Sequence, residues 1–304
     1  MKILMVDGNP AAKLLVDELR KYGHHVDCVN MSHDKDEGVL FNYCKQPFSV
    51  SLMNLVGLGL LEKNYDVVHK NFGLWCCNFD VLFFKLSKKA KLVVHYRGSE
   101  TRERYGLNYR SLVDACIVST PDLLKYHPEA CWIPNMMPIV KEPVRSSKTQ
   151  NIHVVHMTTN RGRKGSDFIC KVMKGLTELN IGIRFTFVEK MHNSEALKIL
   201  DSADILIDKI DTLGGSLGVR LPGHVAYEAW GRGIPVVCDL DERYDDLYGR
   251  AVEYADMECL RDVILSLCDN SKRRYDLAVA GQDFLAEYCS PERVVERVLE
   301  VYEK

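Results

Sequence analysis

Short apolar runs alternate with amphipathic segments along almost the whole chain, and this alternation limits the fold more than any other feature. The run Lys2–Gly8 is typical of a strand, residues 10–23 have apolar side chains at helical spacing, and residues 24–30 form a second predicted strand. Further strands are expected at residues 65–71, 90–98 and 113–121. Because a strand, helix, strand order produces parallel strands covered on both faces, we predict an α/β fold.

The alternation breaks between Pro134 and Gln150, in a stretch rich in Pro, Ser and Lys, and then starts again. The last segment has Ser290 as a predicted N-cap and a Val/Leu stripe that needs a partner surface, which the first half could supply. We predict a first domain at residues 1–138, a linker at 139–150, a second domain at 151–288 and a C-terminal helix at 289–304. The second domain is expected to hold strands at residues 151–159, 183–190, 204–210 and 234–240, with helices at 166–180, 193–203 and from near His224.

Composition excludes several classes of protein. The chain has 40 Lys and Arg against 42 Asp and Glu, so its formal net charge of −2 gives no reason to expect nucleic-acid binding. It begins directly with a strand-like run, which leaves no room for a signal peptide, and no apolar run reaches the roughly 18 residues of a membrane span. The longest apolar stretch, Pro47–Leu61, is predicted to be a core helix, with an interfacial membrane helix as the alternative. Eleven cysteines without a CxxC pattern are typical of reduced thiols in a cytoplasmic protein.

The turn after the first strand fits neither of two common α/β functions. A phosphoacceptor domain needs an acidic pair at this point, but here Gly8 follows Asp7. A dinucleotide-binding turn needs the pattern GxGxxG, whereas this turn continues with Asn9 and Pro10. A nicotinamide or flavin cofactor is therefore not expected.

The segment "TTNRGRKGSD" (residues 158–167) follows the first strand of the second half and precedes a helix. Arg161, Arg163 and Lys164 bring three cations to this helix start, where free backbone amides and the helix dipole favour an anion. The segment is either a solvated basic loop or a site for a phosphate or diphosphate.

Glu228 lies in "GHVAYEAWGRGIPVV", a second helix start, which follows a glycine-rich loop. The backbone amides of Gly223, His224 and Val225 suit a phosphate or sugar oxygen. A carboxylate one turn further on can accept two hydrogen bonds from a ribose diol, although a Glu that only complements the helix dipole is the alternative. Two such helix starts at strand ends of one sheet favour a ligand crevice.

In the first half, "VVHYRGSETR" places His95, Arg97, Ser99 and Glu100 at the end of a strand, where binding groups tend to gather. A single histidine after an apolar strand can equally be structural. His153 and His156 are interpreted as strand residues, because no third ligand for a metal is evident.

Taken in order, these segments resemble glycosyltransferases of the GT-B fold, and most closely the large retaining family 4. Residues 9–29 resemble the first helix and second strand of that family, "VVHYRGSETR" its acceptor-side loop, and residues 113–138 the end of its first domain. "NRGRKGSD" resembles its lysine-glycine phosphate loop and "GHVAYEAWGRGIPVV" its Glu-Ala segment. The resemblance covers nearly the full chain.

The resemblance implies two Rossmann-like, doubly wound parallel-sheet domains facing a cleft, with the C-terminal helix crossing back to the first domain. It implies a nucleotide-sugar donor on the second domain and a carbohydrate or lipid-linked acceptor on the first, with no metal or cofactor required. By position, Lys164 would pair with the donor diphosphate, Glu228 with the ribose hydroxyls, and His95 would lie near the transferred sugar. The other implied site residues are Thr159, Arg161, Arg163, Arg220, Gly223, His224 and Val225 on the donor side, and Asn9, Arg97, Ser99 and Glu100 on the acceptor side.

The chain departs from the family pattern at two positions. The family often has a second Glu eight positions before Glu228, where this chain has Arg220, and an Arg five positions before Lys164, where it has Thr159. Arg161 or Arg163 could replace the second charge, and Arg220 could bind an acidic or otherwise unusual donor. Two alternatives therefore stay open, namely a nucleotide-sugar-binding subunit without catalytic activity and a non-transferase GT-B enzyme such as a sugar-nucleotide epimerase.

The expected location is the cytoplasm. The lysines of residues 85–91 and the apolar stretch before Glu62 would permit peripheral contact with the inner membrane face, although a solvated helix and a core helix account for them equally well. The sequence leaves the donor sugar, the base and the acceptor open.

Overall fold

The computed structural model describes residues 1–8, 10–31, 39–41, 64–71, 90–98, 113–143, 151–179, 182–211 and 220–304. Its contacts divide the chain into two units, Met1–Met136 with Pro291–Lys304, and Met137–Ser290. The predicted core helix Pro47–Leu61 and the lysines at 85–89 lie outside the described residues.

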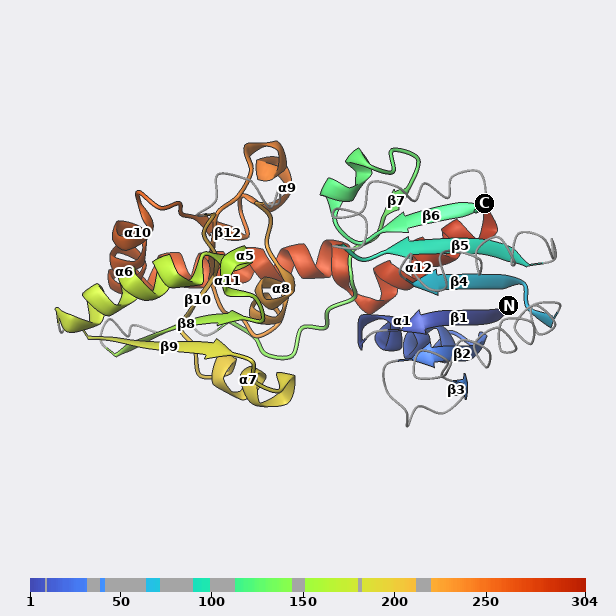
Figure 1. Cartoon of the computed structure of the whole chain (residues 1–304), viewed down its shortest axis with the longest axis horizontal. Helices are drawn as coiled ribbons and strands as arrows, with labels where there is room; N and C mark the ends of the chain where they lie inside the picture. The colour runs from blue at the N-terminus through green and yellow to red at the C-terminus, as the bar shows by residue number, and fades with distance from the viewer. Residues whose placement is uncertain are drawn as a thin grey trace. The chain divides into compact units, whose positions relative to one another are not determined.

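The first unit is built on a parallel sheet, which has seven strands in the part of the chain that is described. The sheet runs in the order β3-β2-β1-β4-β5-β6-β7 (Figure 1). The strands are β1 (Lys2–Gly8), β2 (His25–Met31), β3 (Val39–Phe41), β4 (Val67–Asn71), β5 (Lys91–Tyr96), β6 (Ala115–Val118) and β7 (Cys131–Trp132). Every neighbouring pair is parallel, as the alternation predicts.

Both faces of this sheet are covered. Along β1, Ile3 and Met5 join one core cluster while Leu4 and Val6 join another, because successive side chains of a strand point to opposite faces. The first cluster also holds side chains of α1 (Pro10–Lys21). A run of apolar residues in β1 therefore reflects burial on two sides.

The C-terminal helix α12 (Pro291–Glu303) belongs to the first unit and packs against α1. Four valines of its predicted apolar stripe are buried in the core cluster that contains Ile3 and Met5, and each fully buried side chain of this size stabilises the fold by about 1.5–3 kcal/mol. The prediction that the last helix returns to the first half is thus confirmed. These valines are Val294, Val295, Val298 and Val301.

The second unit contains a five-stranded parallel sheet in the order β12-β11-β10-β8-β9, again among the described residues (Figure 1). The strands are β8 (Ile152–Thr158), β9 (Ile183–Glu189), β10 (Ile205–Lys209), β11 (Val236–Cys238) and β12 (Val252–Tyr254). The helices are α5 (Arg161–Lys164), α6 (Ser166–Glu178), α7 (Asn193–Leu200), α8 (His224–Trp230), α9 (Asp245–Tyr248), α10 (Leu260–Asp269) and α11 (Ser271–Phe284), which continues as a π-helical turn at Leu285–Cys289.

An aromatic cluster fixes α8 against the rest of this unit. Trp230 is fully buried, contacts Tyr227, Tyr248 and Phe284, and donates its indole N–H to the carbonyl of Ala251 at 3.0 Å. Helix α11 passes close to this ring at Gly281, where a Cβ atom would overlap the indole of Trp230. The C-terminal end of α8 is therefore held firmly within this unit.

Two further features bear on the predictions of cellular setting. The eight cysteines within the described ranges are all free thiols. Over those same ranges, no helix combines the length and the apolar character that a membrane crossing needs.

Candidate functional site

The basic segment after β8 folds as a short helix, where the sequence predicts a loop. The side chain of Asn160 accepts a hydrogen bond from the Arg163 backbone N–H at 3.2 Å and so caps α5. Gly165 then adopts a left-handed conformation with φ of 66°, which ends α5 and lets α6 begin at Ser166. The three cations therefore lie in a separate turn that precedes α6.

These cations have different surroundings. Arg161 pairs with Asp167 at 2.8 Å and with Glu189 at 3.1 Å, and its guanidinium lies over the ring of Phe187. Arg163 is exposed, as is Thr159, which directly follows β8. Lys164 points instead to the buried carboxylate of Asp208.

Asp208 on β10 is fully buried, and it joins Lys164 to the start of α8. One carboxylate oxygen accepts from the Lys164 ammonium and the other accepts from the Gly223 backbone N–H at 2.6 Å. Burial would raise the pKa of Asp208, but the Lys164 charge and these hydrogen bonds hold it below its usual value. A Cβ atom at Gly223 would lie 2.5 Å from the Lys164 nitrogen, so a larger residue there would displace the Lys164 ammonium from its place beside Asp208.

Sequence reasoning missed Asp208, although one signal was present. An aspartate within the apolar strand "ILIDKI" breaks the apolar pattern, and a charge buried in a sheet needs a partner.

The Gly223 N–H donates to Asp208, so it is not available to a ligand. Of the three predicted backbone amides, those of His224 and Val225 remain at the start of α8 without an acceptor within the helix.

Glu228 lies one turn into α8, and only 8% of its surface is exposed. Its carboxylate is 3.6 Å from Nε2 of His224, whose side chain is 54% exposed. Asp208 and α8 therefore connect four of the predicted site residues at the carboxyl end of the second sheet, namely Lys164, Gly223, His224 and Glu228.

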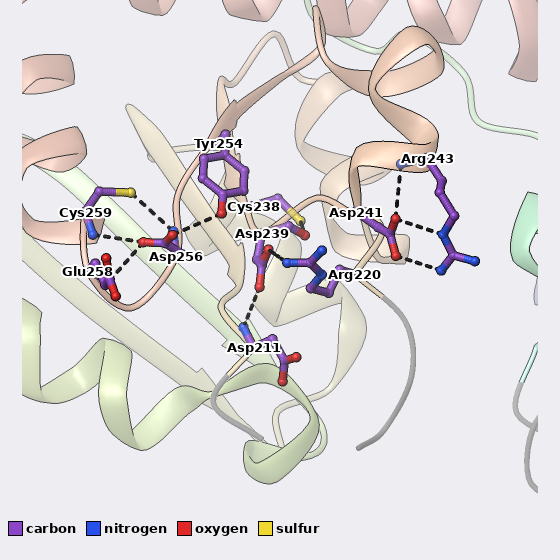
Figure 2. Close-up of polar contacts among 10 residues, drawn as sticks. All are labelled: Asp211, Arg220, Cys238, Asp239, Asp241, Arg243, Tyr254, Asp256, Glu258 and Cys259. Atoms are coloured by element: carbon purple, nitrogen blue, oxygen red, sulfur yellow. Dashed lines mark hydrogen bonds and ion pairs between the residues drawn. The ribbon is translucent and has the colours of Figure 1, made fainter. Parts of the chain in front are cut away.

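Arg220, which stands at the position where the resemblance leads us to expect a Glu, lies among carboxylates that follow β10, β11 and β12 (Figure 2). Its guanidinium is 3.5 Å from Oδ1 of Asp239, whose other oxygen accepts from the Asp211 backbone N–H at 3.2 Å. Burial raises the pKa of Asp239 despite the nearby Arg220 charge. Beside this pair, Asp241 binds Arg243, and Asp256 accepts from Tyr254 (Figure 2).

The charge of Arg220 therefore faces a carboxylate that the protein itself supplies. The sequence did not indicate this partner, because Asp239 is separated from Arg220 by the whole of α8 and β11.

In the first unit, His95 on β5 is buried in a chain of hydrogen bonds. Its Nδ1 lies 3.2 Å from Nε2 of His69, and its Nε2 lies 2.9 Å from the hydroxyl of Ser119. His69 Nδ1 in turn contacts the hydroxyl of Tyr302 on α12 at 2.6 Å, and the Ser119 hydroxyl donates to Oδ1 of Asn135 at 3.2 Å. Both ring nitrogens of His95 are thus used within the protein.

Arg97 follows β5 and is partly exposed. Its Nε and Nη2 donate to Oδ1 of Asn71 at 3.2 and 2.6 Å, and its Nη1 donates to Oδ1 of Asn135. The structure therefore brings Arg97 and His95 together through Asn135 and Ser119. Of the other predicted acceptor-side residues, Asn9, Ser99 and Glu100 lie outside the described residues.

His153 and His156 occupy structural positions in β8. His153 contacts the Ser202 carbonyl at 3.0 Å and the Thr186 hydroxyl at 2.8 Å, and His156 contacts the Ile207 carbonyl and the Ser166 hydroxyl, each at 2.8 Å. Burial lowers the pKa of His156 to about 4. Among the described residues, no three His, Cys, Asp or Glu side chains are grouped as a metal site.

The sequence matches no protein-family model and no curated protein. Among solved structures, TarM is similar with a TM-score of 0.67 and 11% identity, over 100% of this chain and 99% of that chain. A structure of S. aureus TarM with fondaparinux, alpha-GlcNAc-glycerol and UDP is similar with a TM-score of 0.59 and 15% identity, over 82% of this chain and 58% of that chain.

Two other kinds of enzyme are also similar. Acinetobacter baumannii MurG has a TM-score of 0.58 and 13% identity, over 100% of both chains. The UDP-GlcNAc 2-epimerase of Methanocaldococcus jannaschii has a TM-score of 0.59 and 13% identity, over 100% of this chain and 99% of that chain. With the two parallel-sheet units, these similarities show that the chain has a GT-B fold.

Proposed function

We propose that this protein is a glycosyltransferase that moves a sugar from a nucleoside-diphosphate sugar to an acceptor hydroxyl. The observation that carries the proposal is the Lys164 ammonium, held by Asp208 against Gly223 at the carboxyl end of the second sheet, together with Glu228 on the helix that Gly223 begins. Cations at such a position suit a nucleotide diphosphate, which gains negative charge as the sugar leaves. The UDP in the S. aureus TarM structure is consistent with a nucleotide donor.

In this proposal the second unit holds the donor. Lys164, with Arg163 and the amides of His224 and Val225, binds the diphosphate, and Glu228 accepts hydrogen bonds from the ribose. Arg161 serves a secondary role, because it is already paired with two carboxylates. No metal or cofactor is required in this scheme, since the fixed positive groups stabilise the leaving diphosphate.

The first unit holds the acceptor, with Arg97 on the acceptor side. Retention of configuration is a further part of the proposal and rests on the resemblance to the retaining family. A cytoplasmic location, which rests on the cysteine pattern, and peripheral contact with a membrane, which rests on the lysines of residues 85–91 and the apolar stretch before Glu62, also belong to it. Arg220 is expected to lie on the donor side, with its charge balanced by Asp239.

An epimerase acting on the donor alone is the second candidate, since a UDP-GlcNAc 2-epimerase has the same fold at a similar TM-score. A silent nucleotide-sugar-binding subunit is the third, since Arg220 replaces a family carboxylate.

A panel of nucleoside-diphosphate sugars, screened first by thermal shift and then for nucleotide release with candidate acceptors, separates these functions. A transferase releases the nucleotide and forms a glycosylated acceptor. An epimerase converts the donor in the absence of acceptor, and a silent subunit is stabilised by a donor without turnover. If no donor in the panel binds, all three functions are wrong.

A further inference from the structure

The hydrogen-bond chain around His95 has a single direction, which can be worked out from its end. Ser119 has one hydroxyl proton and donates it to Oδ1 of Asn135, so its oxygen must accept from Nε2 of His95. Burial, and then the Arg97 charge, lower the pKa of His95 well below its usual value, so its ring is neutral and has one N–H. That N–H is therefore at Nε2, and Nδ1 of His95 is an acceptor.

The same reasoning extends the chain to the C-terminal helix. Nδ1 of His95 accepts from Nε2 of His69 at 3.2 Å. Burial, with the Arg97 charge, lowers the pKa of His69 to about 3, so His69 also has only one N–H. Its Nδ1 then accepts from the hydroxyl of Tyr302 at 2.6 Å, and each donor from Tyr302 to Ser119 points toward Asn135.

The chain ends on the guanidinium of Arg97. Asn135 is oriented by Ser119, and Asn71 is oriented by its amide group, which contacts the Val6 carbonyl at 3.5 Å. Both asparagines then present Oδ1 to Arg97. Amide oxygens that accept from a guanidinium fix its plane, so these contacts orient Arg97.

The position of Arg97 is one where parallel α/β sheets bind ligands. Asn71 ends β4, Arg97 follows β5 and Ser119 follows β6, and all three strands are parallel. They therefore meet at the carboxyl edge of the first sheet. A planar, oriented guanidinium at such an edge matches the paired oxygens of a phosphate or a carboxylate.

We propose that Arg97 binds a phosphate or carboxylate group of a substrate, and that His95, His69, Ser119 and Tyr302 position it through Asn135. His95 is then a positioning residue, since it is buried and both of its ring nitrogens are committed. That this anionic group belongs to the acceptor rests on the proposed function, whereas anion binding at Arg97 does not.

The test measures anion binding at Arg97 itself, because phosphate could also bind near Lys164. The Arg97 Nε–H resonance of the full-length, ¹⁵N-labelled protein is identified from its loss in Arg97→Lys, and methyl phosphate, acetate and the neutral probe glycerol are titrated separately. We expect a saturable shift with methyl phosphate or acetate and none with glycerol. The anion that binds more tightly identifies the group. The absence of a saturable shift with both anions would overturn the site.

Variants separate positioning from simple stability. Tyr302→Phe and Ser119→Ala each interrupt the chain without touching Arg97, and each is expected to weaken anion affinity threefold to tenfold at a temperature where the protein stays folded. Tyr65→Phe is the matched control, because it removes another hydroxyl of this unit, one that donates to Asp27 at 2.6 Å, and it should bind anions as the wild type does.

Wild-type affinity in both chain variants would contradict the positioning role. If Ser119→Ala does not fold, Tyr302→Phe alone decides. These titrations contain no sugar donor, so their outcome does not depend on the proposed function. If the protein binds an anion at Arg97 but transfers no sugar in the donor panel, the proposed function is contradicted and this inference stands.

Discussion

Asp208→Asn tests whether the buried carboxylate organises the candidate donor site. The substitution removes the negative charge opposite Lys164 but keeps an oxygen that can still accept from the Gly223 N–H. Removing one partner of a buried ion pair costs about 3–5 kcal/mol. The Lys164 side chain is 18% exposed and its ammonium can turn toward water, so we expect a loss of about 2–3 kcal/mol in the free energy of unfolding.

Lys164→Met should cost more, because Asp208 has no exposed surface and its charge would be left without its cation. The double variant should recover part of the loss, which gives the coupling energy directly. Lys272→Met is the matched control, since Lys272 forms a surface pair with Asp276 that contributes about 0.3–0.5 kcal/mol.

Urea unfolding followed by tryptophan fluorescence is a suitable assay, because Trp230 is fully buried in the same unit as Asp208.

The pH dependence of the free energy of unfolding gives an independent check. The pKa of Asp208 is lower in the folded protein, so its contribution is present above the unfolded value of about 3.9 and is lost as the pH falls through the folded value. The deficit of Asp208→Asn should therefore shrink below about pH 4.

Two results would refute this reasoning. Lys164→Met could prove no more destabilising than Lys272→Met, or the double variant could show no coupling. Either would mean that Asp208 does not hold Lys164 in place.

Three further predictions concern packing, pH and nucleotide binding. Gly281→Ala places a Cβ atom against the Trp230 ring and should lower the free energy of unfolding in urea by about 1–3 kcal/mol. Gly175→Ala is the control, because its Cβ atom meets open space and should leave the free energy of unfolding unchanged or raise it. Equal effects of the two variants would contradict the packing at Gly281. The pKa of Asp239 is raised in the folded protein, so its ionised form lowers the stability of the fold at neutral pH. Asp239→Asn should therefore raise the melting temperature at pH 7, and it should have no effect at a pH where Asp239 is protonated in both the folded and the unfolded protein. A lower melting temperature at pH 7 would contradict this prediction. Glu228→Gln should weaken binding of a nucleoside diphosphate, measured by calorimetry, about tenfold, close to 1.4 kcal/mol. A 2′,3′-dideoxy analogue, which lacks both ribose hydroxyls, should bind both proteins alike, and an equal loss with this analogue would show that Glu228 does not contact the ribose.

Local patterns predicted the fold because they dictate it. Residues 3–6 of β1 are buried on both faces of the sheet, so this part of the strand is a continuous apolar stretch. The valine stripe of α12 predicted a partner surface, and α12 packs on the first unit. Short elements such as β7, with two residues, and β12, with three, gave no periodic signal.

The candidate sites were only partly predictable, because their geometry depends on residues far apart in the sequence. Lys164 and Glu228 stood out by local pattern, but Asp208 was concealed within an apolar strand. The contact between His69 and Tyr302 spans 233 positions, and no local pattern reports a pairing of that separation. The roles of Asn9, Ser99 and Glu100 stay predictions.

Nucleotide release coupled to acceptor glycosylation tests the central claim most directly. The wild-type protein, Glu228→Gln and Lys272→Met would each be incubated with the donor found by thermal shift, with and without acceptor. The proposed function predicts nucleoside diphosphate and an acceptor heavier by one sugar for the wild type and Lys272→Met, with release at least about tenfold slower for Glu228→Gln. Conversion of the donor without acceptor, or equal release by Glu228→Gln and the wild type, would contradict it.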